Sequence, residues 1–398
     1  YQGRRRYAEG RRHRRLGRHL KLTRDGRLPE LLAPAGSPEA LRAAVEGGAD
    51  AVYFGASGFN ARAGARNFSD TELRRAVEFC HGRGVRVYLT LNTLIYDREL
   101  RDYLAAAETA YLAGVDALIV ADIGGAAALR RTFPDLPLHA STQMSGHSVG
   151  CAKELASLGF ERMVLAREMS FADIAGFTRT SPIEAEVFIH GALCVCHSGQ
   201  CLFSSMVGGR SGNRGECAQP CRLPYNGGKY PLSLKDNCLA GHIPELIDAH
   251  VASLKIEGRM KGPDYVGPVT AVYRRLLDGH RAATPEEIGY LAEIFSRSGF
   301  TDAYFTGNIS HAMLGTRTEA DKRRSAGRTV PYETKRGLPA VAVPSRAHKA
   351  DEYLPVKPHN KPVKRRTAYM HSVAQLTPAA RKYFEICYLP LAAAADVA

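Results

Sequence analysis

Eight short apolar runs recur along the first two thirds of the chain, each followed by a segment with helical periodicity that usually ends at glycine. Most runs are nearly continuous in apolar residues, as in Ala-Leu-Ile-Val-Ala over 117–121, which is typical of parallel strands buried on both faces. The pattern therefore predicts eight buried strands. They are Glu30–Pro34, Ala51–Gly55, Val87–Asn92, Ala117–Asp122, Pro137–Gln143, Arg162–Glu168, Glu186–Gly191 and Ser253–Gly258.

The intervening segments predict helices by both periodicity and capping. Residues 69–72 read Ser-Asp-Thr-Glu, a capping box, and Ser37 followed by Pro38 is typical of a helix start. A further amphipathic helix is expected over 265–277, and an added one over 284–296. Eight strand-helix units in roughly 250 residues predict an α/β fold of the (β/α)8, TIM-like barrel type. A doubly wound open sheet is the alternative, because the pattern does not show whether the sheet closes.

The charge is distributed unevenly over the 398 residues. The net charge is +14, yet residues 1–24 carry ten Lys/Arg against one acidic residue, and residues 317–366 carry fourteen against five. The segment 25–316 has 28 Lys/Arg against 32 acidic residues. We therefore expect a basic N-terminal tail (1–24), a mildly acidic barrel (25–316), a basic Pro-rich linker (317–366) and the start of a second small α/β unit (367–398).

The composition also narrows the class of protein. An apolar fraction of 45% with 24% charged residues excludes wholesale disorder. No run of about 18 apolar residues occurs, and the Arg-rich start has no apolar stretch like that of a secretory signal. We expect a cytoplasmic protein without a membrane segment.

Polar residues close the predicted strands, which is where (β/α)8 barrels carry their chemistry. The strand ends place Asn92, Gln143 and His190 at the predicted mouth, followed by Glu257 and Arg259. We expect His190, Glu257 and Arg259 to transfer protons or bind an anionic co-substrate. Arg62, Asn92 and Gln143 are expected to line the pocket.

Cysteines crowd the segment that follows the seventh strand. Six of the nine lie within residues 194–238. Cys194, Cys201, Cys217 and Cys221 share one long loop, and thiolates gathered on a loop can bind a metal or a cluster. Their spacing leaves an iron-sulfur cluster, zinc and free structural thiols open, because a zinc site usually has two tight pairs. Cys238 is an alternative fourth ligand.

A glycine-rich stretch lies between the second and third of these cysteines. Residues 208–215 read Gly-Gly-Arg-Ser-Gly-Asn-Arg-Gly, in which Arg210 and Arg214 offer guanidinium donors. The stretch could clamp a phosphate or an RNA backbone over the mouth, or it could be a flexible loop with solvated arginines. No Gly-x-Ser-x-Gly or His-Glu-x-x-His motif is present, which argues against two common hydrolase mechanisms.

At these residues the sequence resembles the collagenase-like peptidases of family U32. The signature is carried by Glu186, Phe188, Gly191-Ala-Leu-Cys194, Gly199, Cys201 and Ser204, with Phe203 as a departure. Further matches are Leu-Ala-Pro-Ala-Gly over 32–36, Asn-Ala-Arg over 60–62, Asn-Arg-Gly over 213–215 with Cys217 and Cys221, and Lys-Ile-Glu-Gly-Arg over 255–259. The resemblance covers about residues 29–325.

This resemblance implies more than proteolysis. Several members of the family act in prephenate-dependent or oxygen-independent hydroxylation of a tRNA uridine, an rRNA cytidine or a ubiquinone precursor, and carry a four-cysteine [4Fe-4S] cluster. By resemblance the ligands here are Cys194, Cys201, Cys217 and Cys221. We therefore expect an iron-sulfur enzyme that hydroxylates a pyrimidine in RNA, with prephenate as a co-substrate. The alternatives are a metal-dependent collagenase-like peptidase and a non-catalytic scaffold that binds a partner hydroxylase.

Overall fold

A closed barrel of eight parallel strands forms the centre of the protein. The computed structural model describes residues 28–56, 58–62, 67–225, 227–325, 367–369 and 386–388. Neighbouring strands pair in chain order, and the last barrel strand, β9, pairs with both β7 and β1, which closes the ring. The predicted (β/α)8 barrel is thus confirmed and the open sheet is excluded. The barrel strands are β1 (Glu30–Pro34), β2 (Ala51–Gly55), β3 (Arg86–Leu91), β4 (Ala117–Val120), β5 (Leu138–Ala140), β6 (Phe160–Val164), β7 (Glu184–Gly191) and β9 (Ser253–Ile256).

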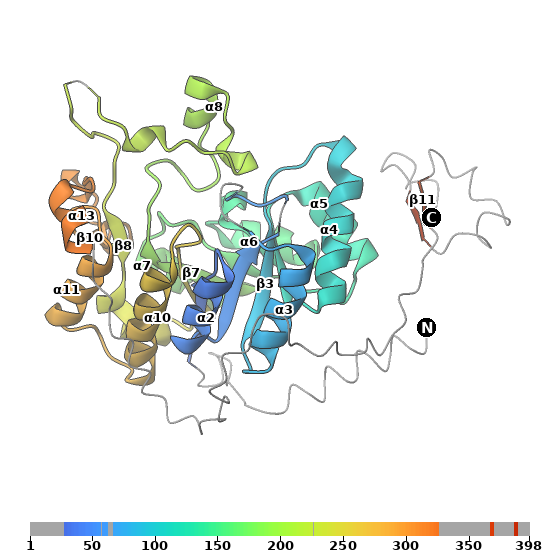
Figure 1. The fold of residues 1–398 in the computed structure, drawn as a ribbon, viewed down its shortest axis with the longest axis horizontal. Coiled ribbons are helices and arrows are strands. Elements are labelled where there is room, and N and C mark those ends of the chain that lie inside the picture. The colour runs from blue at the N-terminus through green and yellow to red at the C-terminus, as the bar shows by residue number, and fades with distance from the viewer. Residues whose placement is uncertain are drawn as a thin grey trace, which may run out of the picture. The chain divides into compact units, whose positions relative to one another are not determined.

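Helices follow the strands and cover the outside of the barrel (Figure 1). Both predicted caps form: the Ser37 side chain accepts from the Ala40 N–H, and Ser69 and Glu72 make a reciprocal capping box. The α-helices of the barrel and its additions are α2 (Pro38–Glu46), α3 (Asp70–His81), α4 (Leu100–Ala113), α5 (Ile123–Thr132), α6 (Val149–Ser157), α7 (Phe171–Thr180), α8 (Phe203–Gly208), α9 (Ile243–Asp248), α10 (Pro263–Asp278), α11 (Pro285–Ile294), α12 (Ala303–Thr306) and α13 (Glu319–Ser325). Short 3-10 turns are η2 (Asp97–Glu99), η3 (Thr142–Met144), η4 (Gly212–Arg214), η5 (Pro220–Arg222), η6 (Ala240–His242) and η7 (His311–Met313).

Several predicted strands are too long because their polar ends cap the next element. Asp122 is the N-cap of α5, where its carboxylate accepts from the Gly125 N–H at 2.7 Å. Ser141 likewise caps η3 by accepting from the Gln143 N–H at 3.2 Å. A short polar side chain satisfies a helix-start N–H better than it extends a strand. The strand predicted over 162–168 is also shifted, since β6 ends at Val164.

A network of buried charged side chains lies inside the barrel. Glu30 accepts from Arg162 at 2.7 Å and from the Tyr88 hydroxyl at 2.7 Å. Arg162 reaches Glu186 at 3.3 Å, and Glu186 accepts from the Lys255 ammonium at 2.7 Å. All five side chains are buried, so each charge depends on its partner across the barrel. The network ties β1, β6, β7 and β9 together beneath the mouth.

Two short strands extend the sheet outside the barrel at β7. Strand β8 (Asp236–Cys238) pairs antiparallel with β7 and parallel with β10 (Phe300–Thr301). The predicted helix over 284–296 is confirmed as α11, with Thr284 and Glu287 in a capping box. In Figure 1, β8, β10, α11 and α13 lie together beside the barrel, and the long loop that carries α8 projects beyond one end of it.

The terminal segments of the sequence analysis lie mostly outside the described residues. The tail 1–24 and residues 326–366 of the predicted linker are not among them. The first part of the predicted linker contains α13, residues 319–325, so helical structure extends past residue 316. In 367–398 two short strands, β11 (Thr367–Tyr369) and β12 (Ile386–Tyr388), pair in parallel and belong to a separate unit, 336–398. Within the described residues, no helix has the length and apolarity that crossing a bilayer requires.

Candidate active site

A pocket opens at the carboxyl ends of the barrel strands. It collects residues from six of the eight strands and from the loops that follow them, which is the usual position of a (β/α)8 active site. Five of the predicted pocket and proton-transfer residues line it: Arg62, Asn92, Gln143, Glu257 and Arg259. The other lining residues are Tyr53, Ala61, Thr90, Ile119, Ser141, Thr142, Val164, Arg167, Phe188 and Lys255.

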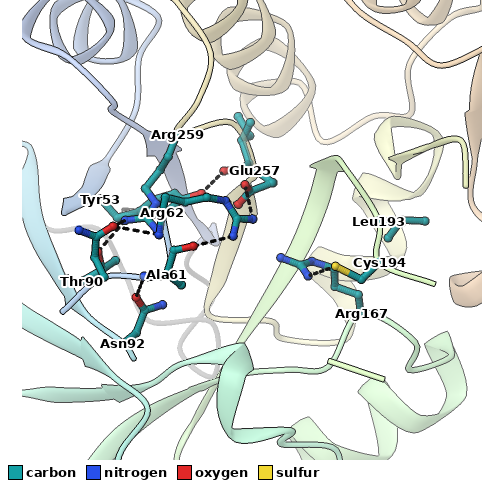
Figure 2. A network of polar contacts seen from close by, with 12 residues as sticks. Tyr53, Ala61, Arg62, Thr90, Asn92, Arg167, Leu193, Cys194, Glu257 and Arg259 are labelled. Carbon is teal, nitrogen blue, oxygen red and sulfur yellow. Dashed lines mark hydrogen bonds and ion pairs between the residues drawn. The ribbon is translucent and has the colours of Figure 1, made fainter. Parts of the chain in front are cut away.

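Glu257 and Arg62 form an ion pair at the rim of the pocket. The Arg62 guanidinium donates to Glu257 Oε1 at 3.0 Å, and the Tyr53 hydroxyl lies 3.2 Å from Oε2 (Figure 2). Burial alone would raise the pKa of Glu257, but Arg62, Arg167 and Arg259 outweigh it and lower the pKa to about 2. Glu257 is therefore an ionised carboxylate at neutral pH, able to accept a hydrogen bond but holding no proton to donate.

Arg259 lies beside Arg62 and is fixed by neutral partners. Its guanidinium donates to the Thr90 hydroxyl at 2.7 Å and points toward Asn60 Oδ1 at 3.4 Å (Figure 2). Burial and the nearby Arg62 charge lower the pKa of Arg259 to about 10, so it stays a cation at neutral pH. Asn92 joins two loops by accepting from the Ala61 N–H at 3.0 Å and donating to Ser141 Oγ at 3.0 Å.

Arg167 links the pocket to the loop that carries the cysteines, residues 191–238, which we call the cysteine loop. Its guanidinium lies 4.2 Å above the Phe188 ring, and one of its nitrogens is 3.9 Å from Cys194 Sγ (Figure 2). Two buried polar atoms of the lining, Arg167 Nε and Thr142 Oγ1, have no hydrogen-bond partner among the described residues. Buried polar groups are normally paired, so these two atoms are positioned to meet a ligand.

The charge balance of the pocket is positive. Arg62, Arg167, Arg259 and Lys255 face a single carboxylate on the lining, Glu257. Lys255 is already paired with Glu186 below the pocket and lies 4.2 Å from the centre of the Tyr53 ring. Three arginines against one carboxylate leave two positive charges uncompensated, which favours an anionic ligand with two negative groups.

The cysteine loop is anchored to the neighbouring barrel loops. Ser198 donates its N–H and hydroxyl to Glu168 at 3.0 and 2.9 Å. Arg222 donates to the Leu193 carbonyl at 2.6 Å and to Ser233 Oγ at 3.0 Å. These contacts hold both ends of the loop over the pocket.

Two motif glycines permit close approaches that any side chain would block. A Cβ at Gly36 would lie 1.9 Å from the Arg259 carbonyl oxygen. Gly199 has a φ of +76°, and a Cβ there would lie 2.3 Å from the Gln143 carbonyl oxygen. Because neither glycine has a side chain, the backbone at Gly199 can pack against that of Gln143, and the backbone after β1 can pack against that of Arg259.

Cys221 lies within electrostatic range of the other three predicted cysteine ligands. Burial raises the pKa of Cys221, Arg222 lowers it, and charge on Cys194, Cys217 and Cys201 raises it. The Gln219 N–H donates to Cys217 Sγ at 3.4 Å. A donor set of soft thiolates with N–H donors to sulfur suits an iron-sulfur cluster. Even so, among the described residues no three or more Cys, His, Asp or Glu side chains are close enough to hold a metal ion.

Cys238 and His190 are not among the residues that line the pocket. Cys238 Sγ is buried 3.6 Å from the Tyr273 hydroxyl of α10, and His190 Nδ1 is 3.2 Å from the same hydroxyl. His190 packs among aromatic rings and does not line the pocket, and burial lowers its pKa to about 3. Its position does not support a proton-transfer role. Cys238 lies on β8, and burial raises its pKa.

The two arginines of the glycine-rich stretch have different surroundings. Arg214 donates to both oxygens of Glu99, at 2.6 and 2.8 Å, and to the Leu94 carbonyl at 2.6 Å. Arg210 is exposed at the outer end of the loop. Neither lines the pocket, so Arg214 fastens the loop to the segment after β3 and only Arg210 is left facing solvent.

The predicted site residues did not include several side chains that shape the pocket. Tyr53, Thr90 and Ser141 line it from within or just beyond their strands. The signal that could identify them is strand alternation, since Thr90 shares a face with Asn92, two residues later. Looking only at the last residues of each strand misses inward-facing residues that lie earlier in the strand.

The comparisons with known proteins identify the family. The profile of Peptidase family U32 matches residues 36–314. The chain belongs to peptidase family U32.

Three curated relatives have different names. The 23S rRNA 5-hydroxycytidine C2501 synthase of Escherichia coli (strain K12) is 44% identical over 286 residues, which cover 69% of this chain and 42% of that protein. The tRNA hydroxylation protein P1 of Bacillus subtilis (strain 168) is 39% identical over 277 residues, 65% of each chain. A protein named Collagenase from Porphyromonas gingivalis is 35% identical over 308 residues, covering 70% of this chain and 73% of that one. The U32 chain thus spans less than two thirds of the first two relatives.

Proposed function

We propose that this U32 protein is an enzyme that hydroxylates a pyrimidine of tRNA or rRNA. In this proposal Cys194, Cys201, Cys217 and Cys221 hold a [4Fe-4S] cluster, and the barrel pocket binds a small dianionic co-substrate such as prephenate. The observation that carries the proposal is the arginine-lined pocket directly beneath the cysteine loop, joined to it by the contact of Arg167 with Cys194. The names of two relatives support RNA as the substrate.

The pocket residues suit the two carboxylates of prephenate. Arg62 and Arg259 lie beside one another, and each retains guanidinium N–H groups beyond those used in its own contacts. Arg167 Nε and Thr142 Oγ1 supply further donors. Charge-assisted hydrogen bonds from paired guanidinium groups to carboxylates are the strongest non-covalent contacts available to such a ligand.

Each remaining residue has a role that its contacts define. Glu257 holds Arg62 in place and itself accepts from the Tyr53 hydroxyl, and its carboxylate can accept a hydrogen bond from a bound group. Phe188 stacks beneath Arg167 and keeps water from one side of the pocket. The cluster, when bound, would supply one-electron redox chemistry near the pocket. Arg167, which lies beside Cys194 Sγ, would then stabilise negative charge on that sulfur.

The cluster is tested by anaerobic purification of wild type, C221S and C238S, followed by iron, sulfide and visible-absorption analysis. We expect wild type and C238S to bind iron and sulfide equally and C221S to lose most of both, because Cys238 is buried beside Tyr273 and Cys221 lies within electrostatic range of the other three predicted ligands. Colourless wild-type protein with stoichiometric zinc would disprove the cluster. Equal loss in both variants would indicate a folding defect instead, which circular dichroism would detect.

The reaction is tested by nucleoside mass spectrometry of tRNA and rRNA from cells that lack the gene. We expect one hydroxylated pyrimidine to disappear and to return with wild type and with R210M but not with R62M. Arg62 lines the pocket, whereas Arg210 is an exposed arginine outside it. Unchanged RNA would reject RNA hydroxylation. Activity that appears only with a co-purifying protein would favour a scaffold subunit.

A second candidate function is peptidase activity, which the relative named Collagenase supports. It predicts chelator-sensitive cleavage of gelatin by the pure protein. Intact gelatin together with a missing RNA modification in the gene deletion would reject it.

A further inference from the structure

A fifth thiol of the cysteine loop lies against one of the four predicted cluster ligands. Cys196 is not among those ligands, yet its thiol is hydrogen-bonded to the side chain of Cys201 and lies within electrostatic range of Cys194. Cys196 and Cys201 are both partly exposed, and both are free thiols in this structure. The loop therefore carries a pair of contacting thiols that solvent can reach.

A tight turn brings these two thiols together. The Gln200 N–H donates to the His197 carbonyl at 3.1 Å, which closes a four-residue turn. Gly199 has a φ of +76° at the third position of this turn, a conformation that glycine adopts without strain. Cys196 and Cys201 directly flank the turn. They therefore occupy facing positions, like the residue pair next to a two-residue hairpin loop.

The turn is fixed to the neighbouring barrel loops. Ser198 donates its N–H and hydroxyl to Glu168 at 3.0 and 2.9 Å, and the backbone of Gly199 packs against that of Gln143. These contacts hold the two thiols opposite each other. A disulfide requires Cα atoms roughly 4.4 to 6.8 Å apart, and facing residues of a hairpin are separated by about 4.5 to 5.5 Å.

We infer that Cys196 and Cys201 form a reversible disulfide in the cluster-free protein, and that Cys196 is the resolving thiol that preserves Cys201. The oxidant is a peroxide. Its O–O bond breaks, one thiol becomes a sulfenic acid, and water leaves; the second thiol then attacks this sulfur, the S–S bond forms, and a second water leaves. Together the two thiols lose two electrons and two protons.

The disulfide would make cluster insertion depend on reduction. A Cys201 sulfur held in a disulfide cannot bind iron, and a dithiol reductant restores both thiols by exchange. Without Cys196, a sulfenic acid at Cys201 loses the thiol that lies against it, and oxidation can continue to the irreversible sulfinic acid. The preservation of a cluster ligand rests on the proposed function, whereas the disulfide itself does not.

The disulfide is tested by thiol mapping on full-length wild type, C196S and C151S from which a chelator has removed iron. C151S is the matched control because Cys151 is also partly exposed but lies on α6, outside the cysteine loop. Each protein is treated with hydrogen peroxide, its free thiols are blocked with iodoacetamide, and its disulfides are reduced and labelled with N-ethylmaleimide. Tandem mass spectrometry identifies the labelled cysteines, and circular dichroism shows whether each variant is folded.

In wild type and in the control we expect Cys196 and Cys201 to carry most of the maleimide label, because they already lie in contact. In C196S the label at Cys201 should fall, and sulfinic acid should appear there instead. Label on Cys201 together with Cys194, Cys217 or Cys221, with Cys196 blocked by iodoacetamide, would overturn the inference. Wild type without label at Cys196 and Cys201 would overturn it as well.

The role of Cys196 in preserving Cys201 is tested by cluster reassembly. The same three proteins are treated with peroxide, reduced with dithiothreitol and supplied with iron and sulfide under anaerobic conditions. We expect wild type and C151S to recover most of their iron and sulfide and C196S to recover little. Equal recovery in all three would reject this role. A C196S protein that lacks iron before any peroxide treatment would make Cys196 a ligand instead.

The two readouts separate this inference from the proposed function. Thiol mapping needs neither a cluster nor RNA, so it decides the disulfide even if wild type never binds iron; the role in preserving a ligand would then fall with the cluster. Conversely, a cluster that assembles in wild type without any bond between Cys196 and Cys201 after peroxide would reject the inference and leave the proposed function standing.

Discussion

Glu30 and Glu257 show how one residue type takes two roles within the same barrel. Both are buried against arginines, and both have a pKa of about 2. Glu257 faces the pocket, where a ligand can reach it. Glu30 lies below the pocket, enclosed by Arg162, Tyr88 and Arg86, so its charge serves the fold.

The buried position of Glu30 predicts an acid-dependent stability. Burial raises the pKa of Glu30, but Arg162 and Arg86 outweigh burial and lower it from 4.5 to about 2. The unfolded chain therefore binds more protons than the folded one between these values. The contribution of Glu30 is complete above the unfolded pKa and is lost as pH falls toward the folded pKa.

We expect wild type to lose about 2 kcal/mol more stability than E30Q between about pH 6 and about pH 3. At neutral pH, E30Q should be less stable by roughly 3 kcal/mol because Arg162 is left buried with fewer partners. Urea unfolding at several pH values measures both effects. E78Q, at an exposed position on α3, is the control. Parallel pH profiles for wild type and E30Q would contradict this assignment.

Among the elements, the cysteine loop depends on a few polar anchors because it has little apolar core of its own. Leu202, Met206 and Val207 of its α8 region are exposed, so the helix contributes little burial. Arg214 supplies three charge-assisted hydrogen bonds to Glu99 and the Leu94 carbonyl instead. The position of the loop over the pocket therefore depends on side chains of the segment after β3.

We expect R214M to raise the hydrogen-exchange rate of residues 208–217 by roughly tenfold, since charge-assisted hydrogen bonds contribute about 1.5 to 3 kcal/mol. R210M removes a neighbouring charge without such contacts and should leave exchange unchanged. The barrel strands should be protected equally in both variants. Equal effects of R214M and R210M would show that Arg214 does not anchor the loop.

At the scale of the whole molecule, charge and chemistry reside in different segments. The net charge of +14 comes from the two basic segments, 1–24 and 317–366, whereas 25–316 is slightly acidic. Attraction of basic segments to RNA phosphates is independent of sequence and weakens with salt. The barrel with its cysteine loop would determine which base reacts.

Deleting residues 1–24 is expected to lower RNA affinity by at least about tenfold at low salt and to flatten its salt dependence. Iron and sulfide content should be unchanged, because the four cysteines lie far along the chain from this segment. Anisotropy with labelled RNA and metal analysis on the same preparation measure the two quantities. Loss of the cluster in the truncated protein would contradict this division.

The sequence by itself determined the features that depend on near neighbours. Apolar runs identified all eight barrel strands, and Ser37 and Ser69 were recognisable as caps because a cap bonds within three residues. Five of the eight predicted catalytic and substrate-binding residues line the pocket, since the carboxyl ends of parallel strands meet at one end of a barrel.

The tertiary structure decided what depends on contacts distant in the chain. A register shift between Phe188 and His190 breaks the alternation of β7, so Phe188 faces the pocket while His190 faces Tyr273 of α10. The grouping of Lys261, Arg297 and Arg317 likewise requires three separate segments to fold against Phe295. Periodicity reports only local burial, whereas bulges and long-range charge clusters are set by how strands close and loops pack.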